Sequence, residues 1–208
     1  MRQKEILITL PVRRSFKNVF QIKITLLGTN PPVWRRIQVP ESFTFYDLHV
    51  AIQNAMGWTD SHLHQYEIED ENVPEKFRRI ECPFGVDEIE EDEFLMTTEV
   101  ALREHFCEAG NKMLYRYDFG DDWEHEVRLE GIFPKEPKVR YPRCLAGRLA
   151  CPPEDCGGVS GYYDCIKALK KQNDSDGLLT WLGPWRPERF DPKEVKFESP
   201  RRRLEDSL

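Results

Sequence analysis

Alternating apolar and polar side chains predict three strands and a helix in the N-terminal part of the chain. Phe20, Ile22, Ile24 and Leu26 alternate with polar residues in a strand predicted at 19–27, and residues 33–39 return as a second strand after a turn rich in glycine and proline. A helix follows, with Thr44 as its N-cap and Gly57 as its stop, and residues 62–69 form the next strand. This order of strand, strand, helix and strand is β-grasp-like. It predicts a mixed, mainly antiparallel sheet covered by the helix.

The clearest alternation lies in residues 115–130, which predict a central β-hairpin. Pairing Tyr117 with Trp123 and Tyr115 with His125 places every large ring on one face, whereas a shift of one residue would scatter the rings. This face needs a cover, so we expect Trp123 to be buried between Tyr117 and the N-terminal helix.

Beyond the hairpin the periodicity fades. Residues 131–160 are rich in proline, glycine and cysteine and have no period, which is typical of a functional or metal-tied loop. Residues 162–171 and 178–185 are expected to be helical. The expected fold class is therefore α+β, with a β-grasp-like N-terminal half, a central hairpin and a loop-rich, helical C-terminal part.

The composition is that of one folded domain. The chain has 208 residues, of which 39% are hydrophobic, and we expect an arm at 1–18, a single domain at 19–195 and a flexible tail at 196–208. The net charge of −7 disfavours non-specific binding to DNA or to anionic lipid. There is no secretory signal pattern and no apolar run of roughly 20 residues. We therefore expect a cytoplasmic protein without membrane segments, whose cysteines are thiols or metal ligands.

The hairpin tip carries three carboxylates, Asp118, Asp121 and Asp122, beside Trp123. Gly120 lies between them and is free to adopt a positive φ. These acids could hold a hard cation or another ligand. They could equally serve the turn itself, because Asp side chains accept hydrogen bonds from nearby backbone N–H groups.

Histidines on two predicted strands suggest a metal site. His62 and His64 are two residues apart and would project from one face, and His125 lies on the ring-bearing face of the hairpin. Glu154 and Asp155 are the nearest further carboxylates. Three histidines with carboxylates match the ligand set of zinc or another divalent metal, and we expect them to converge on one site. The alternative is that each imidazole is a hydrogen-bonded core residue.

A weaker alternative zinc site is offered by Cys144, Cys151, Cys156 and Cys165. Structural zinc sites usually contain a pair separated by two to four residues, which only Cys151 and Cys156 approach. Otherwise the cysteines are buried apolar side chains. Trp34 and Arg36 are candidates for stacking on a ligand, with ordinary strand surface as the alternative.

Several motifs follow one another along the chain. They are Pro31-Pro32-Val33-Trp34-Arg35-Arg36, Gly57-Trp58 with Ser61-His62-Leu63-His64, Tyr117-Asp118-Phe119-Gly120-Asp121 with Trp123 and His125, and Tyr141-Pro142-Arg143-Cys144 through Pro152-Pro153-Glu154-Asp155, Gly157-Gly158 and Gly161-Tyr162. Together these motifs resemble the plasmid pRiA4b ORF-3-like family over about residues 18–195. The resemblance implies a mixed α/β fold without an assigned activity. It also implies that the position of Cys156 accepts other residues, which weighs against a zinc site there.

Some members of that family carry a resolvase label. A serine resolvase needs a nucleophilic serine near the N-terminus and a basic DNA-binding module, and this sequence shows neither. The function we expect is binding of a small ligand or a divalent metal at a His/Asp site at the tip of the 115–130 hairpin. The first alternative is a metal-dependent hydrolase with Glu154 or Asp155 as general base. The second is an accessory protein of mobile-element DNA transactions that binds a protein partner.

Overall fold

The computed structural model describes residues 10, 14–71, 76–84, 95–172, 174 and 177–208. The strands are β1 (Asn18–Leu26), β2 (Trp34–Pro40), β3 (His64–Glu69), β4 (Phe77–Glu81), β5 (Leu95–Met96), β6 (Lys112–Tyr117), β7 (Trp123–Pro134) and β8 (Arg143–Arg148). The helices are α1 (Phe45–Met56), α2 (Gly158–Lys171), α3 (Leu178–Leu182) and α4 (Pro200–Ser207), with a short 3-10 turn at Leu102–Glu104.

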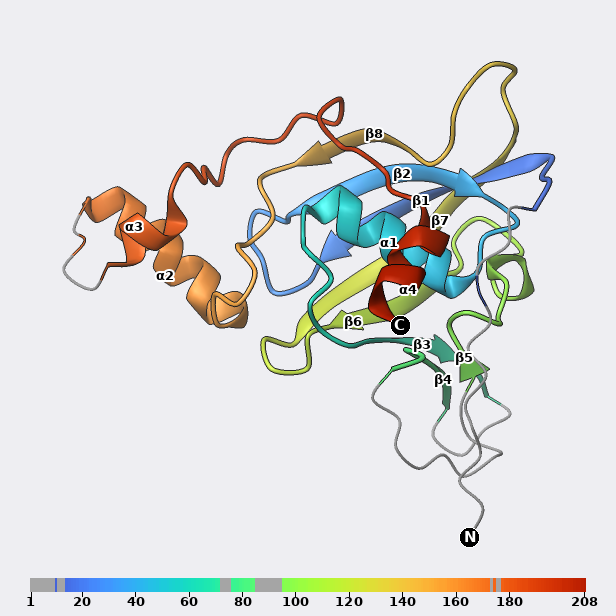
Figure 1. Ribbon diagram of the computed structural model, residues 1–208, viewed down its shortest axis with the longest axis horizontal. Helices are drawn as coiled ribbons and strands as arrows, with labels where there is room; N and C mark the ends of the chain where they lie inside the picture. Colours follow the sequence, from blue (N-terminus) through green and yellow to red (C-terminus); the bar gives the residue numbers. More distant parts are fainter. Residues whose placement is uncertain (1–9, 11–13, 72–75, 85–94, 173, 175–176) are drawn as a thin grey trace, which may run out of the picture.

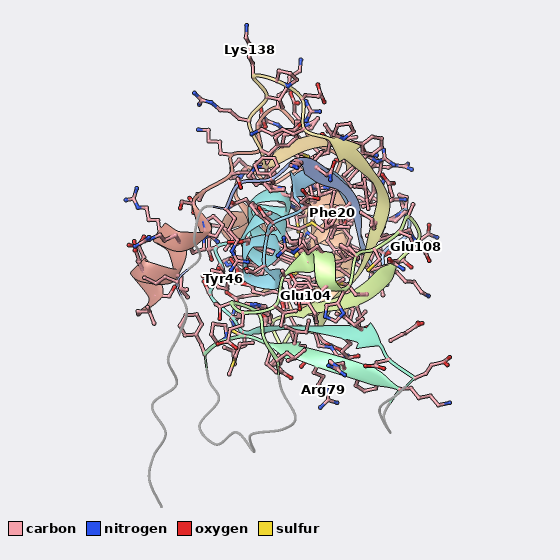
Figure 2. All side chains as sticks on the ribbon, turned by 90° about the vertical axis from the view of Figure 1, so that its right-hand side faces the viewer. Phe20, Tyr46, Arg79, Glu104, Glu108 and Lys138 are labelled. Atoms are coloured by element: carbon pink, nitrogen blue, oxygen red, sulfur yellow. The ribbon has the colours of Figure 1, made fainter. Side chains whose placement is uncertain are left out.

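The strands form one sheet in the order β5-β4-β3-β6-β7-β1-β2-β8 (Figure 1). Only β4 and β5 pair in parallel, and every other neighbouring pair in the described residues is antiparallel. The sheet curls around α1 when the molecule is seen end-on (Figure 2). The structure thus confirms the α+β class, the mainly antiparallel sheet and the N-terminal order of strand, strand, helix and strand.

Local signals in the sequence set both ends of α1. Thr44 accepts a hydrogen bond from the Asp47 N–H at 3.2 Å, and the Asp47 carboxylate accepts one from the Thr44 N–H at 2.9 Å. This reciprocal capping box satisfies two backbone donors that the first turn leaves open. Gly57 ends the helix with φ of 95°, a conformation that glycine adopts without steric cost. The apolar side of α1 faces the sheet and forms the core with it.

The hairpin of β6 and β7 has the expected register. Tyr117 pairs with Trp123 and Tyr115 with His125, and all four side chains are completely buried. Trp58, the second residue after α1, covers this face: its ring is stacked on Tyr117 at 5.1 Å and lies 5.7 Å from Trp123. The ring-bearing face of the hairpin is therefore the part of the core nearest to the tip.

The tip itself differs from the prediction. Gly120 does not take the positive φ. Asp118 and Asp122 do, with φ of 58° and 53°. The reason is that Oδ1 of Asp118 accepts hydrogen bonds from the N–H groups of Gly120 and Asp121, which stabilises a turn in which the aspartates carry the left-handed conformation.

The C-terminal part is more regular than expected. Within residues 131–160, β7 continues to Pro134 and β8 pairs with β2 as the edge of the sheet. The connecting loop projects from the sheet, with Lys138 at its tip (Figure 2). Part of the expected flexible tail forms α4, which lies over α1 (Figure 1), and its Leu204 is buried against Tyr46 and Val50. The tail is ordered there because it covers apolar surface of α1.

Most of the expected N-terminal arm lies outside the described residues. No helix in the described part of the chain is long and apolar enough to cross a membrane.

Candidate functional site

A histidine and two aspartates meet beside the hairpin tip. Nε2 of His62 lies 2.7 Å from Oδ1 of Asp155 and 3.6 Å from Oδ2 of Asp118. The ligand atoms of the three side chains lie within 4.8 Å of one another, so small side-chain rotations could bring all three onto one metal ion. Asp118 is buried, His62 half-buried and Asp155 exposed. The group therefore opens to solvent on one side.

The backbone presets both carboxylates. Asp118 and Asp155 adopt left-handed conformations with φ of 58° and 59°, which Asp tolerates better than most residues. The N–H groups of Gly120 and Asp121 donate to Oδ1 of Asp118 at 2.9 and 3.3 Å. Turn chemistry thus accounts for one oxygen of Asp118, while the other oxygen is directed toward His62.

The loop before α2 is docked on the hairpin tip. Oδ2 of Asp121 accepts a hydrogen bond from the N–H of Gly157 at 3.1 Å. Gly158 has φ of 66°, and a Cβ at this position would lie 2.5 Å from the carbonyl oxygen of Asp121. Only glycine permits this close approach. The docking places Asp155 against His62 although the two are far apart in sequence.

Glu154 fixes the same loop to the segment after α1. Its carboxylate accepts hydrogen bonds from the Tyr117 hydroxyl at 2.5 Å and from the hydroxyl and N–H of Thr59 at 2.5 and 2.9 Å. Burial acts to raise the pKa of Glu154, but these hydrogen bonds outweigh it and hold the pKa below its ordinary value. A carboxylate so engaged is a poor general base near neutral pH. Glu154 positions the site.

A second group, His49, Asp60 and His64, also has ligand atoms within 4.8 Å of one another. Nδ1 of His49 lies 2.8 Å from the Tyr115 hydroxyl, and its Nε2 lies 2.6 Å from Oδ1 of Asp60. Gln53 donates to the same hydroxyl at 3.0 Å. All three bonds are satisfied when the hydroxyl donates to Nδ1 and the Nε2–H of His49 donates to Asp60.

The rings of His49 and His64 are stacked, with centroids 3.5 Å apart and planes 10° from parallel. A metal ion on an imidazole lies near the ring plane, about 2.0–2.1 Å from the nitrogen, so two rings stacked in this way cannot share one ion. Burial and the neighbouring His49 hold the pKa of His64 well below its ordinary value, against the opposing effect of Asp60. His64 is neutral, and its buried Nε2 has no hydrogen-bond partner in the described structure. This group is a buried polar network.

The structure does not bring the three histidines into one group of candidate ligands. His62 precedes β3, which begins at His64, so the alternation of a strand does not govern both. His62 and His64 line one cavity of about 320 Å³ but belong to separate groups of candidate ligands. His125 is in neither group: its Nδ1–H donates to the carbonyl oxygen of Trp123 at 3.1 Å, and its ring lies 5.5 Å from that of Trp58. His125 therefore fits the alternative interpretation, that of a hydrogen-bonded core residue.

Trp34 and Arg36 lie away from the His/Asp group. Arg35, between them, donates to the carbonyl oxygen of Ala55 in α1, so its neighbours in β2 point to the opposite face of the sheet. There Arg36 forms an ion pair with Glu130 at 2.5 Å and lies over the Trp34 ring at 5.2 Å. These contacts are those of an exposed strand surface.

Two further candidates from the hairpin have structural partners. Asp122 forms an ion pair with Arg116 at 2.9 Å, and it belongs to neither group of candidate ligands. Trp123 is completely buried, and a side chain in the core cannot contact a ligand at the open side of the group.

The structure does not bring the cysteines together with other candidate metal ligands in the described residues. Cys156 lies beside Cys165, and Cys144 and Cys151 lie near Arg35. Burial raises the pKa of the Cys156 thiol to about 12. Among the described residues, no group of three candidate ligands contains a cysteine. The interpretation as buried thiols is the one that the geometry supports.

His49 and Asp60 were missed from the sequence. His49 lies four residues after Phe45 on the buried side of α1, and this spacing could have placed it among the core positions. Asp60 offers no comparable signal. Its position depends on a left-handed backbone with φ of 64° and on Arg203, which comes from the far end of the chain.

Comparisons with known proteins agree with this fold. The family model described as plasmid pRiA4b ORF-3-like protein matches residues 18–196. The uncharacterized protein y4hQ of Sinorhizobium fredii (strain NBRC 101917 / NGR234) is 36% identical over 154 residues, which span 73% of each chain. A crystal structure of a protein of unknown function from Methanosarcina mazei Go1 is 39% identical. It superimposes with a TM-score of 0.78 and covers 88% of this chain and 99% of its own.

Proposed function

The chain belongs to the plasmid pRiA4b ORF-3-like family, and we propose that it binds one divalent transition-metal ion through His62, Asp118 and Asp155. The observation that carries the proposal is the position of Nε2 of His62, which faces one oxygen of each carboxylate at 2.7 and 3.6 Å. One imidazole nitrogen with two carboxylate oxygens suits ions such as Mn²⁺, Fe²⁺ and Zn²⁺. The ion would replace the proton that His62 shares with Asp155.

The surroundings support binding because they hold the ligands in place. The hydrogen bonds of Asp118 to its own turn and the docking of Gly157 on Asp121 fix the two parts of the group relative to each other. Ligands whose positions are preset lose less conformational freedom when the ion binds. Three protein ligands leave at least one coordination position open to water or to a small ligand.

The hydrolase alternative has less support. Both oxygens of Glu154 are engaged by Thr59 and Tyr117, and Asp155 is one of the proposed ligands. Neither is therefore a free general base, and we propose metal binding without assigning a reaction.

Calorimetric titration of the metal-free full chain with Mn²⁺ and Zn²⁺, with Mg²⁺ for comparison, tests the proposal. We expect one transition-metal ion per chain. His62→Gln and Asp155→Asn should each weaken binding by about tenfold or more, as the loss of a ligand requires.

Two variants serve as controls. Asp122→Asn removes a carboxylate of the same tip that is paired with Arg116, and His64→Gln removes a histidine of the stacked pair. Both should bind the ion as the unmodified chain does. The proposal fails if no ion binds at about 1 mM, or if His62→Gln and His64→Gln bind equally well.

A further inference from the structure

A cavity of about 400 Å³ lies on the other side of Glu154, beside the C-terminal end of α1. It is large enough for a small organic molecule. Its apolar walls come from tryptophan, phenylalanine and proline side chains, among them Trp58, Trp185 and Phe190. Its cationic lining residues are Arg35, Arg186, Arg189 and Lys196. Its acidic lining residues are Glu154, Asp191 and Glu194. Four cations against three acids give the lining a small excess of positive charge in a chain whose net charge is −7.

Arg35 is the central feature of this cavity. It is only 1% exposed, and no carboxylate of the described residues forms an ion pair with it. Its Nε donates to the carbonyl oxygen of Ala55 at 2.8 Å, and its Nη1 donates to those of Trp34 and Arg148 at 2.9 and 3.2 Å. One face of the guanidinium stacks on the Phe190 ring at 3.7 Å.

These contacts leave one edge of the guanidinium for a ligand. Nη2 of Arg35 makes no hydrogen bond to the described residues, and Arg35 is one of the residues that line the cavity. A buried cation without a counter-charge is costly. Carbonyl dipoles offset part of this cost, and a bound anion would offset more.

The other charges of the cavity are only partly paired. Arg189 is paired with Glu194 at 2.9 Å, and the carboxylate of Glu154 is occupied by Thr59 and Tyr117. In the described part of the chain, Arg186 and Lys196 have no carboxylate partner. Outside the pair of Arg189 and Glu194, the lining thus holds three cations, Arg35, Arg186 and Lys196, against two acids, Glu154 and Asp191, and keeps a net positive charge.

We propose that this cavity binds a small organic anion, a carboxylate or a phosphate monoester carried on a flat apolar body. The anionic group meets Nη2 of Arg35, and the apolar body lies between Trp58 and Trp185. Both indoles are fixed before binding, because their N–H groups donate to the carbonyl oxygens of Pro152 and Cys151 at 3.1 and 2.9 Å. Walls that are already ordered reduce the entropic cost of binding.

Titration of the full chain with benzoate, phenyl phosphate and neutral benzamide tests this proposal. We expect at least one anion to bind about tenfold or more tightly than benzamide, and the ratio of the two anions tells a carboxylate site from a phosphate site. The indole N–H signals of Trp58 and Trp185 should shift in NMR spectra. Those of Trp34 and Trp181, which lie outside the cavity, should not. Equal binding of benzamide, shifts at Trp34 or Trp181 alone, or no saturation by either anion at about 10 mM overturns the proposal.

Substitutions of the cationic residues test which of them bind the anion. Arg35→Lys keeps the charge but loses the planar fork, and the double variant Arg186→Ala with Lys196→Ala removes exposed cations without touching the core. Each should weaken anion binding by about tenfold, while Arg201→Ala on α4 should leave it unchanged. Unchanged affinity in both cavity variants would mean that these cations do not bind the anion. The role of Arg35 would then be limited to its hydrogen bonds with backbone carbonyl groups, such as that of Ala55 in α1. His62→Gln should retain anion binding, because His62 does not line this cavity. The anion site and the metal site are therefore tested independently.

Discussion

Arg203 of α4 approaches Asp60, with Nη1 3.4 Å from Oδ2, and so joins the end of the chain to the buried network of His49 and His64. Residues 200–207 lie beyond the segment matched by the family model, which ends at residue 196. The helix is attached by charge at Arg203 and by apolar contact at Leu204, which is completely buried. We therefore regard α4 as an integral part of this fold.

Leu204→Ala is expected to lower the free energy of unfolding by about 2–5 kcal/mol, as for other buried leucines, because the side chain packs on Tyr46 and Val50. Urea unfolding measures the change. Arg201→Ala is the matched control on the same helix: its exposed pair with Glu205 contributes at most about 0.5 kcal/mol. Equal midpoints for the two variants would show that α4 does not stabilise the domain.

Trp123→Ala should be among the most destabilising substitutions, with a loss of about 3–5 kcal/mol. The side chain is completely buried beneath Trp58 and opposite Tyr117, so its removal leaves a cavity that rigid neighbours cannot fill. Trp181→Ala, at a site that is 52% exposed, should cost less than about 1 kcal/mol. Similar denaturant midpoints for both variants would contradict the packing described for the hairpin.

The parts of this fold that could be predicted are those governed by local rules. The hairpin register follows from alternation on both of its strands, because a shift of one residue moves Trp123 and Tyr117 to opposite faces. The ends of α1 follow from Thr44 and Gly57, whose preferences act within one turn of helix. Neither inference needs knowledge of distant residues.

The parts that could not be predicted depend on long-range contacts. The strand β8 is half-buried along most of its length, so it shows no alternation, and it exists only because β2 offers an edge for pairing. In the candidate site, His62 and Asp118 were visible as candidates. Their separation from His64 depends on where β3 begins and on the stacking of His64 against α1.

Gly161→Ala should disrupt the loop that carries Asp155. A Cβ at Gly161 would lie 1.6 Å from the carbonyl oxygen of Cys156, so either the start of α2 or the docked loop must move. We expect the free energy of unfolding to fall by about 3 kcal/mol or more, together with weaker metal binding. Gly131→Ala is the control, because its Cβ would meet only the exposed ring of Phe133, which can rotate away. Equal effects of the two substitutions would contradict the geometry of the loop.

His125 makes the stability of the protein depend on pH. Burial lowers the pKa of His125 from 6.5 to about 4, although hydrogen bonds to the carbonyl oxygens of Tyr115 and Trp123 act in the opposite direction. In the unfolded chain the pKa returns to about 6.5. Below that pH the unfolded state binds a proton that the folded state does not, so acid favours unfolding. The stabilisation is complete above about pH 6.5 and is lost as the pH falls to about 4, with a total of about 3 kcal/mol.

Urea unfolding at about pH 7.5 and about pH 5 measures this effect, and linkage predicts that His125 accounts for about 2 kcal/mol of the difference. His125→Gln should be less stable than the unmodified chain at the higher pH, because a polar side chain replaces a fitted ring. It should nevertheless lose about 2 kcal/mol less between the two pH values. All other titrating groups are common to both proteins and cancel in the comparison. Parallel pH profiles would show that His125 is not held neutral in the core.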